Sequence, residues 1–487
     1  NFLIGVRYES YLNALDGFDP RFNGNGIPYR FAQYSVDGLD ITVGNFYEQF
    51  GNGIIFRSYE EKSLGIDNVM DGIRLKYRPT AGLTIKSFFG KQRLYFEQGP
   101  GIVRGIDAEL NLNESFKGLN NSKTNVLIGA GFISRFQQSS NPVYNLPKNV
   151  GAYSIRSTVN RGKVSFNSEY AYKYNDPDGG VTYNNYAPGN AIMSNLSYSE
   201  RGLGIILEAH RVDNMDFRSA RGAVLNDLTL SYIPAITKQH TYTLAAFYPF
   251  STQTMGELGF LGELNYNIKK KSTLGGKYGA LLNVNYSRVN ALNGGNSVLT
   301  ENESHTPIFF SVIGEDLYFR DFNIELKKKL SKKAKLTTSY VDMIYNKDVV
   351  QGKDVGKDIH ARIGIVELNY KLKPKHTIRT ELQYLSVDKD EKYDEDSGDW
   401  MMALVEYTFA PHWFFAVVDQ YNGGYTDYEQ VVHEAVHYLN ISCGYSSGTN
   451  RFELGYGKKR EGIFCVGGVC RNVPSSNGFT FSITSSF

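Results

Sequence analysis

Runs of about ten residues in which apolar and polar side chains alternate constrain this chain most strongly. Residues 163–174, 257–266, 278–287 and 378–385 show the pattern best, and helical periodicity is nearly absent. Successive side chains of a β-strand point to opposite faces, so each run needs an apolar environment on one side and a polar one on the other. The sequence therefore predicts a nearly all-β protein.

The lengths of the connections between these runs distinguish a soluble sandwich from a membrane barrel. One set is short and often basic, and several of its members directly follow Tyr or Phe: residues 78–81, 331–334, 373–375 and 410–412. The other set is long and polar: residues 174–190, 290–316, 346–358, 388–398 and 421–431. Short periplasmic turns, long extracellular loops and interfacial aromatic residues are typical of a transmembrane antiparallel β-barrel.

The spacing divides residues 1–487 into about 24 strands, within a range of 22 to 26, and includes predicted strands at 222–232 and 238–248. About ten residues per crossing and about ten per connection give the same number. We predict a single barrel domain. Residues 49–69 are the least strand-like long connection, and they either form an extracellular loop or fold inward as a constriction.

A barrel of this width encloses a lumen that wall side chains alone do not fill, so the lumen is either open or plugged. The polar faces of the runs supply the predicted lumen-facing residues, whose mixed charges imply no strong ion selectivity. They are Lys163, Asn167, Glu169, Glu257, Glu263, Asn283, Arg379 and Glu381.

Composition excludes other classes. The net charge of +2 gives no electrostatic footprint for nucleic acid, and no apolar run is long enough for a transmembrane helix. The chain starts at Asn1 inside a strand-like run without a signal peptide. We expect that the natural start lies upstream, that a signal peptide is removed, and that the protein resides in the bacterial outer membrane.

The segment from Cys465 to Cys470 contains Gly467-Gly468, which suits a two-residue hairpin turn. Such a turn places the two cysteines opposite each other, within the distance that a disulfide tolerates. We predict a Cys465–Cys470 disulfide at an extracellular hairpin tip, with zinc binding as the lesser alternative. Cys443 is then a lone thiol.

Residues 433–437 spell H-E-x-x-H, the zinc-protease motif, but they lie in an alternating run. In a strand, His433 and His437 are about 13 Å apart, too far to share one zinc ion. Residues 388–396 are predicted to form a solvated acidic loop, with loose divalent-cation binding as the alternative. Residues 16–26 are predicted to form a structured loop, with ligand binding as the lesser option. No catalytic residue, cofactor or metal is predicted.

The end of the chain carries a last amphipathic strand. Phe479, Phe481, Ile483 and Phe487 fall on one face. A terminal strand of this kind is predicted to be the signal that barrel-assembly machinery reads.

Residues 17–31, 43–65, 464–471 and 479–487 resemble an outer-membrane barrel family of the Bacteroidetes lineage that is catalogued as a domain of unknown function. The resemblance implies the fold and the location and brings no catalytic residues. Two functions follow as hypotheses: a porin-like channel or transporter for small solutes, or a structural or accessory subunit of a multi-protein outer-membrane complex. An outer-membrane enzyme and a soluble adhesin are lesser alternatives. Expected partners are outer-membrane lipid, lipopolysaccharide, the barrel-assembly machinery and other outer-membrane subunits.

Overall fold

The structure is a computed structural model of residues 1–487. It describes all of them except 14–18, 63–65, 140–144, 178–186, 225, 293–312, 353–357, 390–392, 467–468 and 486–487. For residues 313, 463–466 and 469–473 it describes the backbone alone.

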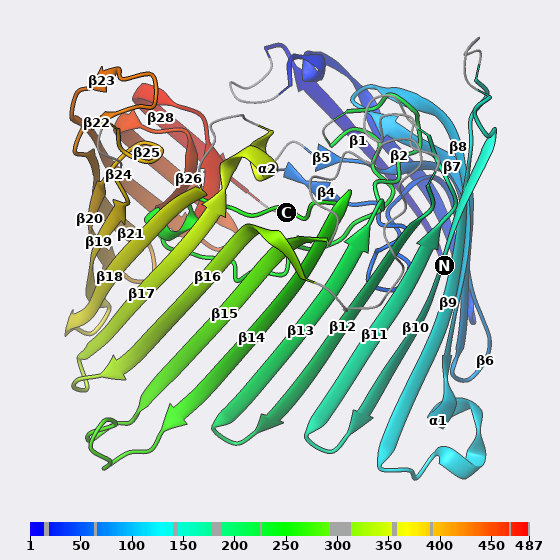
Figure 1. Ribbon diagram of the computed structural model, residues 1–487, viewed down its shortest axis with the longest axis horizontal. Coiled ribbons are helices and arrows are strands. Elements are labelled where there is room, and N and C mark those ends of the chain that lie inside the picture. Colours follow the sequence, from blue (N-terminus) through cyan, green and yellow to red (C-terminus); the bar gives the residue numbers. More distant parts are fainter. Residues whose placement is uncertain are drawn as a thin grey trace.

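Within the described residues, 22 strands form one antiparallel sheet that curls into a barrel (Figure 1). This number lies inside the predicted range. The strands are β1 (Phe2–Tyr11), β2 (Gly24–Val36), β3 (Leu39–Phe46), β6 (Met70–Thr80), β7 (Leu83–Leu94), β8 (Glu97–Asn111), β9 (Thr124–Phe136), β10 (Asn149–Arg161), β11 (Val164–Lys173), β12 (Gly189–Glu200), β13 (Leu203–Asp213), β14 (Gly256–Ile268), β15 (Ala280–Leu292), β16 (Ile313–Lys329), β17 (Ala334–Asn346), β18 (Asp358–Lys373), β19 (His376–Val387), β20 (Trp400–Phe409), β21 (Trp413–Asn422), β24 (Val436–Ser447), β25 (Asn450–Lys459) and β28 (Ser476–Thr484).

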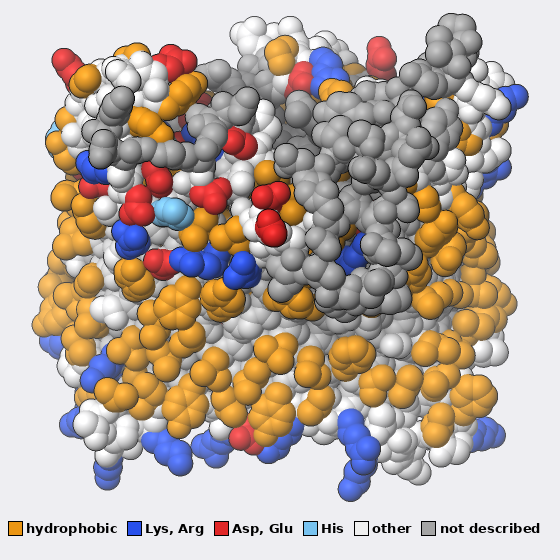
Figure 2. All heavy atoms as spheres, viewed as in Figure 1, with side chains coloured by type: hydrophobic (Ala, Val, Ile, Leu, Met, Phe, Trp, Pro, Cys, Tyr) orange, Lys and Arg blue, Asp and Glu red, His pale blue; other side chains and the backbone are white. Residues whose placement is uncertain are grey.

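Each strand of the sheet pairs with the next one along the chain, from β1 at one end to β28 at the other. The register keeps the two faces separate. Phe260, Tyr286 and Phe322 point outward and are exposed, whereas Asn285 and Asn323 of the neighbouring positions point inward and are buried. The outward side chains form an apolar belt around the barrel, with lysines and arginines at the short-turn end (Figure 2). This is the surface that a lipid bilayer requires.

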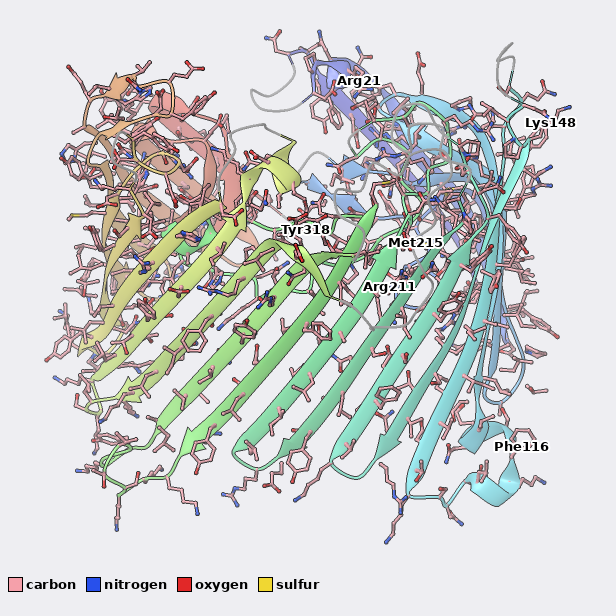
Figure 3. All side chains as sticks on the ribbon, in the orientation of Figure 1. Arg21, Phe116, Lys148, Arg211, Met215 and Tyr318 are labelled. Carbon is pink, nitrogen blue, oxygen red and sulfur yellow. The ribbon has the colours of Figure 1, made fainter. Side chains whose placement is uncertain are left out.

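The connections alternate in length as the sequence predicts. At one end most turns are short, such as 162–163, 201–202 and 374–375; at the other end most are long. Residues 112–123 and 269–279 are long exceptions at the short-turn end, and β7 and β8 are joined by only two residues at the opposite end. Figure 3 shows Phe116 in the first of these exceptions, far from Met215 inside the upper half. No helix in the described residues is long and apolar enough to cross a membrane.

The predicted strands at 222–232 and 238–248 are wrong. Strand β13 pairs directly with β14, from Leu203 opposite Tyr266 to Asp213 opposite Gly256, and the residues between them do not join the sheet. They run as largely irregular chain inside the barrel (Figure 1). The alternation in 238–244 has another cause: Lys238, His240 and Tyr242 bond to the inner wall through their side chains, and Leu244, at the start of a 3-10 turn, bonds to it through its backbone N.

Small elements occupy the ends of the barrel and its interior. They are the two-stranded pairs β4 (Glu60–Glu61) with β5 (Ile66–Asp67), β22 (Tyr425–Thr426) with β23 (Val432–His433), and β26 (Gly462–Val466) with β27 (Val469–Val473), the helices α1 (Leu112–Ser115) and α2 (Lys347–Gln351), and the 3-10 turns Pro20–Phe22, Lys117–Leu119 and Leu244–Ala246.

Candidate functional site

Two long connections fold into the barrel, and we call them together the plug: residues 47–69, between β3 and β6, and residues 214–255, between β13 and β14. They bond to each other through the backbone, because Arg57 N donates to Leu230 O at 2.9 Å and Tyr232 N donates to Gly53 O at 3.0 Å. The Arg57 guanidinium also lies 4.0 Å from the centre of the Tyr232 ring. The two segments therefore form one body.

The first segment is fastened to the wall by polar contacts. The Asn52 backbone N donates to Glu169 Oε2 at 2.7 Å, and the Asn52 amide donates to Asn167 at 3.1 Å. Gly51 beside it has a φ of +51°, and a Cβ there would lie 2.5 Å from Glu169 Oε2. Only glycine fits this close approach without strain.

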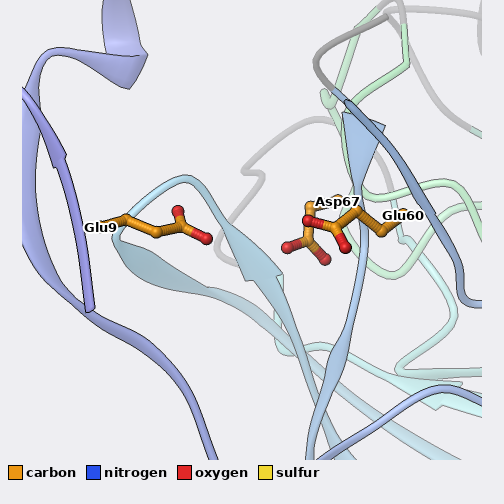
Figure 4. Close-up of side chains that lie close together, drawn as sticks. All are labelled: Glu9, Glu60 and Asp67. Carbon is orange, nitrogen blue, oxygen red and sulfur yellow. The ribbon is translucent and has the colours of Figure 1, made fainter. Parts of the chain in front are cut away.

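Charged groups clamp the same segment at its other end. The carboxylates of Glu9, Glu60 and Asp67 lie within 4.8 Å of one another, on β1, β4 and β5 (Figure 4). Such a cluster is a candidate cation site, but Arg7 contacts all three carboxylates at 2.6–2.8 Å, and Arg93 contacts Glu9 at 2.7 Å and Asp67 at 2.6 Å. Two guanidinium groups already supply the positive charge, so the cluster is an ion-pair clamp between plug and wall.

In the second segment, every second residue from Lys238 to Leu244 bonds to the opposite wall. Lys238 donates to Asn283 at 2.7 Å and to Asn323 at 2.8 Å, and His240 lies 2.6 Å from the buried Asp321. Tyr242 donates to Glu367 at 3.4 Å, and the Leu244 backbone N donates to Gln383 at 2.9 Å. Burial lowers the pKa of the Lys238 ammonium, because desolvation disfavours its charged form.

Apolar contacts complete the seat. Beyond Leu244, the plug packs Ala245, Tyr248 and Phe250 into a buried cluster with inward-facing residues of β15–β21, among them Phe319 and Val341. A second cluster joins Phe50, Ile54, Ile55 and Phe56 of the first segment to Met215, Phe217 and Leu230 of the second and to β7–β13. The plug is therefore packed like a protein core on two sides of the barrel.

The sequence-predicted lumen residues fall into two groups. Seven have internal partners: Glu169 and Asn167 contact Asn52, Glu257 contacts His210, Glu263 contacts Asn265, Asn283 contacts Lys238, and Arg379 contacts Glu367 and Glu381. Lys163 instead lies in the short turn before β11, is exposed, and pairs with Glu200.

Below the plug, a cavity of about 1230 Å³ opens at the short-turn end. Its lining comes from the turns of that end and from the adjoining ends of β12–β19. Neither the lysines of this cavity nor the plug residues Lys238, His240 and Tyr242 were predicted from the sequence to be functional. The basic residues of the short turns could have indicated the cavity. The alternation in residues 238–244 could have indicated the contacts between plug and wall.

The H-E-x-x-H histidines bind different carboxylates. His433 lies 2.9 Å from Asp427, and His437, on β24, lies 2.8 Å from Asp419. Glu391 and its neighbours in the predicted acidic loop, residues 16–18 of the turn-rich loop, and Phe487 lie outside the described residues. Phe479, Phe481 and Ile483 are exposed on β28.

The Cys465–Cys470 disulfide stays a prediction, because the side chains of both residues lie outside those described. The backbone of β26 and β27 pairs Cys465 with Cys470 and Val466 with Val469. We expect trypsin to release residues 461–471 from the unreduced protein as one peptide, lighter by two hydrogen atoms than after reduction. Mass spectrometry checks this, with Cys443→Ser as a control that leaves the mass unchanged. Alkylation of both cysteines without reductant would contradict the disulfide.

An antiparallel barrel with an apolar outer belt, a polar inner face and short turns at one end defines the class of outer-membrane β-barrel proteins. Within this class, the chain belongs to a family of unknown function (DUF6029), whose model matches residues 1–487. No curated protein matches the chain.

Several solved structures are similar to it at low identity. The copper transporter OprC is 10% identical with a TM-score of 0.38, covering 100% of this chain and 79% of OprC. The siderophore receptor PirA from Acinetobacter baumannii is 9% identical with a TM-score of 0.41, covering 95% and 78% of the two chains. The outer membrane protein opdK from Pseudomonas aeruginosa is 10% identical with a TM-score of 0.34, covering 78% and 93%.

Proposed function

We propose that this protein is an outer-membrane channel or transporter for small solutes whose passage is restricted by the plug. The observation that carries the proposal is the division of the interior into two parts. A plug seated through polar contacts fills one part, and a cavity of about 1230 Å³ opens from the short-turn end into the other. A lumen divided in this way favours restricted passage of small solutes over free diffusion through a wide pore.

Planar bilayers test the proposal. We expect the purified full-length chain to give small, discrete conductance steps, since the plug occupies much of the lumen. Heat-modifiable migration on a gel verifies that the barrel in the same preparation is folded. A folded barrel that never conducts, and that does not take up small solutes into liposomes, would contradict a channel or transporter.

A structural or accessory subunit of a larger outer-membrane complex is the second candidate. The two apolar clusters between plug and wall favour it, because a seat packed like a protein core resists displacement. Purification from native membranes in a mild detergent separates the candidates. An accessory subunit comes with stoichiometric partners, whereas a channel runs alone and conducts.

We also propose where the protein resides and what it contacts there. A location in the outer membrane is supported by the apolar belt, and contact with lipopolysaccharide is supported by the long loops at one end. Recognition by the barrel-assembly machinery is supported by the exposed Phe479 and Phe481 on the last strand. An origin in the Bacteroidetes lineage rests on the sequence resemblance alone.

A further inference from the structure

The cavity at the short-turn end, which we call the vestibule, is lined by an unusual concentration of positive charge. Among the described residues, its lining has a single carboxylate, Glu200, which pairs with Lys163. The cationic lining residues are Arg201, Lys269, Lys270, Lys327, Lys329, Lys332, Lys333, Lys335 and Lys371. The whole chain carries a net charge of only +2, so this charge is gathered at one place.

The register shows that the strand lysines of the vestibule face the lumen. Lys329 is paired with Lys335, Lys335 with Asn369, and Asn369 with Arg379. Arg379 bonds to Glu367 and Glu381 inside the barrel, so the entire row points inward. Lys327 and Lys371 lie two residues from members of this row and share its face.

These cations are largely uncompensated. Lys327 pairs with Glu325 at 2.7 Å, and Lys329 lies 5.4 Å from the centre of the Tyr278 ring. Among the residues that the structure describes, no ion pair joins a carboxylate to Lys329, Lys335 or Lys371, nor to the lining lysines of the turns, Lys269, Lys270, Lys332 and Lys333. Closely spaced like charges repel one another, so a bound anion stabilises this arrangement.

We propose that the vestibule binds a small polyanion, a molecule with several phosphate or carboxylate groups, from the periplasmic side. A volume of about 1230 Å³ holds more than one such group but excludes a folded domain. Lysine ammonium groups on flexible stems satisfy phosphate oxygens as point charges without fixed geometry. The proposal names a ligand class for the proposed channel and rests on that function only for the route of entry.

Calorimetry with inorganic tripolyphosphate tests the vestibule on the full-length protein in nanodiscs of neutral lipid. The test variant is Lys329→Gln with Lys335→Gln and Lys371→Gln. The matched control is Lys328→Gln with Lys373→Gln and Lys375→Gln, which removes the same charge at the same end but outside the cavity lining. We expect the test variant to weaken binding by roughly tenfold or more and the control to change it less than about twofold.

Binding is also expected to weaken steadily as NaCl rises from about 0.05 to 0.5 M, because screening reduces the attraction. Equal losses in both variants would overturn the proposal and point to the rim lysines and lipid headgroups. Failure of the wild-type protein to bind tripolyphosphate at low salt would also overturn it. Calorimetry measures binding independently of conduction. A barrel that binds tripolyphosphate but does not conduct would therefore contradict the channel and support anion binding in the vestibule.

Discussion

Removal of residues 214–255 is expected to raise the conductance of the barrel by roughly an order of magnitude or more, because a barrel of 22 strands leaves a lumen that only a plug closes. The structure provides a clean junction for the deletion, since Asp213 and Gly256 are paired across β13 and β14. A two-residue Asn-Gly turn therefore joins the strands without changing their register. Single-channel recording in planar bilayers measures the effect.

The control for this deletion is removal of residues 427–431, between β22 and β23, which lie outside the plug. It is expected to leave conductance unchanged. Because deletion also uncovers apolar wall residues, a second variant, Lys238→Ala with His240→Ala and Tyr242→Phe, loosens the seat while keeping the segment. A folded deletion variant with wild-type conductance would show that residues 214–255 do not restrict passage.

Replacement of Arg93 is expected to be the most destabilising single change in the clamp between plug and wall. The Arg93 side chain is 4% exposed and pairs with Glu9 and Asp67. Arg93→Met leaves these carboxylates with Arg7 alone, and breaking a buried ion pair costs about 3–5 kcal/mol. We expect a lower temperature for the heat-modifiable shift on gels and earlier unfolding in denaturant.

Arg30→Met is the matched control for Arg93→Met. Arg30 pairs with Asp71 at 3.4 Å, and its side chain is 58% exposed. Exposed pairs contribute about 0–1 kcal/mol, so this variant is expected to behave as wild type. Restoring the charge balance with Arg93→Met and Asp67→Asn together is expected to recover part of the loss. An Arg93→Met barrel as stable as the Arg30→Met barrel would contradict a clamp role.

The sequence predicts the wall well because a membrane barrel imposes two environments on every strand. Each of the 22 strands of the sheet corresponds to a predicted strand, with boundary differences of a few residues except at β8, which was predicted over 104–113 and begins at Glu97. The alternation of turn lengths was also predicted. The alternation in residues 238–244 led to a wrong prediction of a strand. This alternation reflects contacts with the inner wall, where Lys238 and His240 bind partners through their side chains instead of joining the sheet through the backbone.

The vestibule could not be predicted because its parts are distant in the sequence. Lys329, Lys335 and Lys371 each look like a basic residue at the end of a strand, and such residues usually face solvent. Only the register of β16–β18 places them in one inward row. The apolar residues 54–56 gave a clearer signal, since an isolated apolar run in a weakly strand-like connection has to be buried somewhere.

The clamp also links the first strand of the sheet to the interior of the barrel. Strand β1 lies at one end of the sheet and pairs with β2, yet its Arg7 and Glu9 reach residues 53 to 84 positions further along the chain. Glu60 and Asp67 lie on the plug, so these ion pairs of the first strand exist only in a barrel that holds the plug. The contacts that fasten the plug therefore also tie the terminal strand of the sheet to the interior.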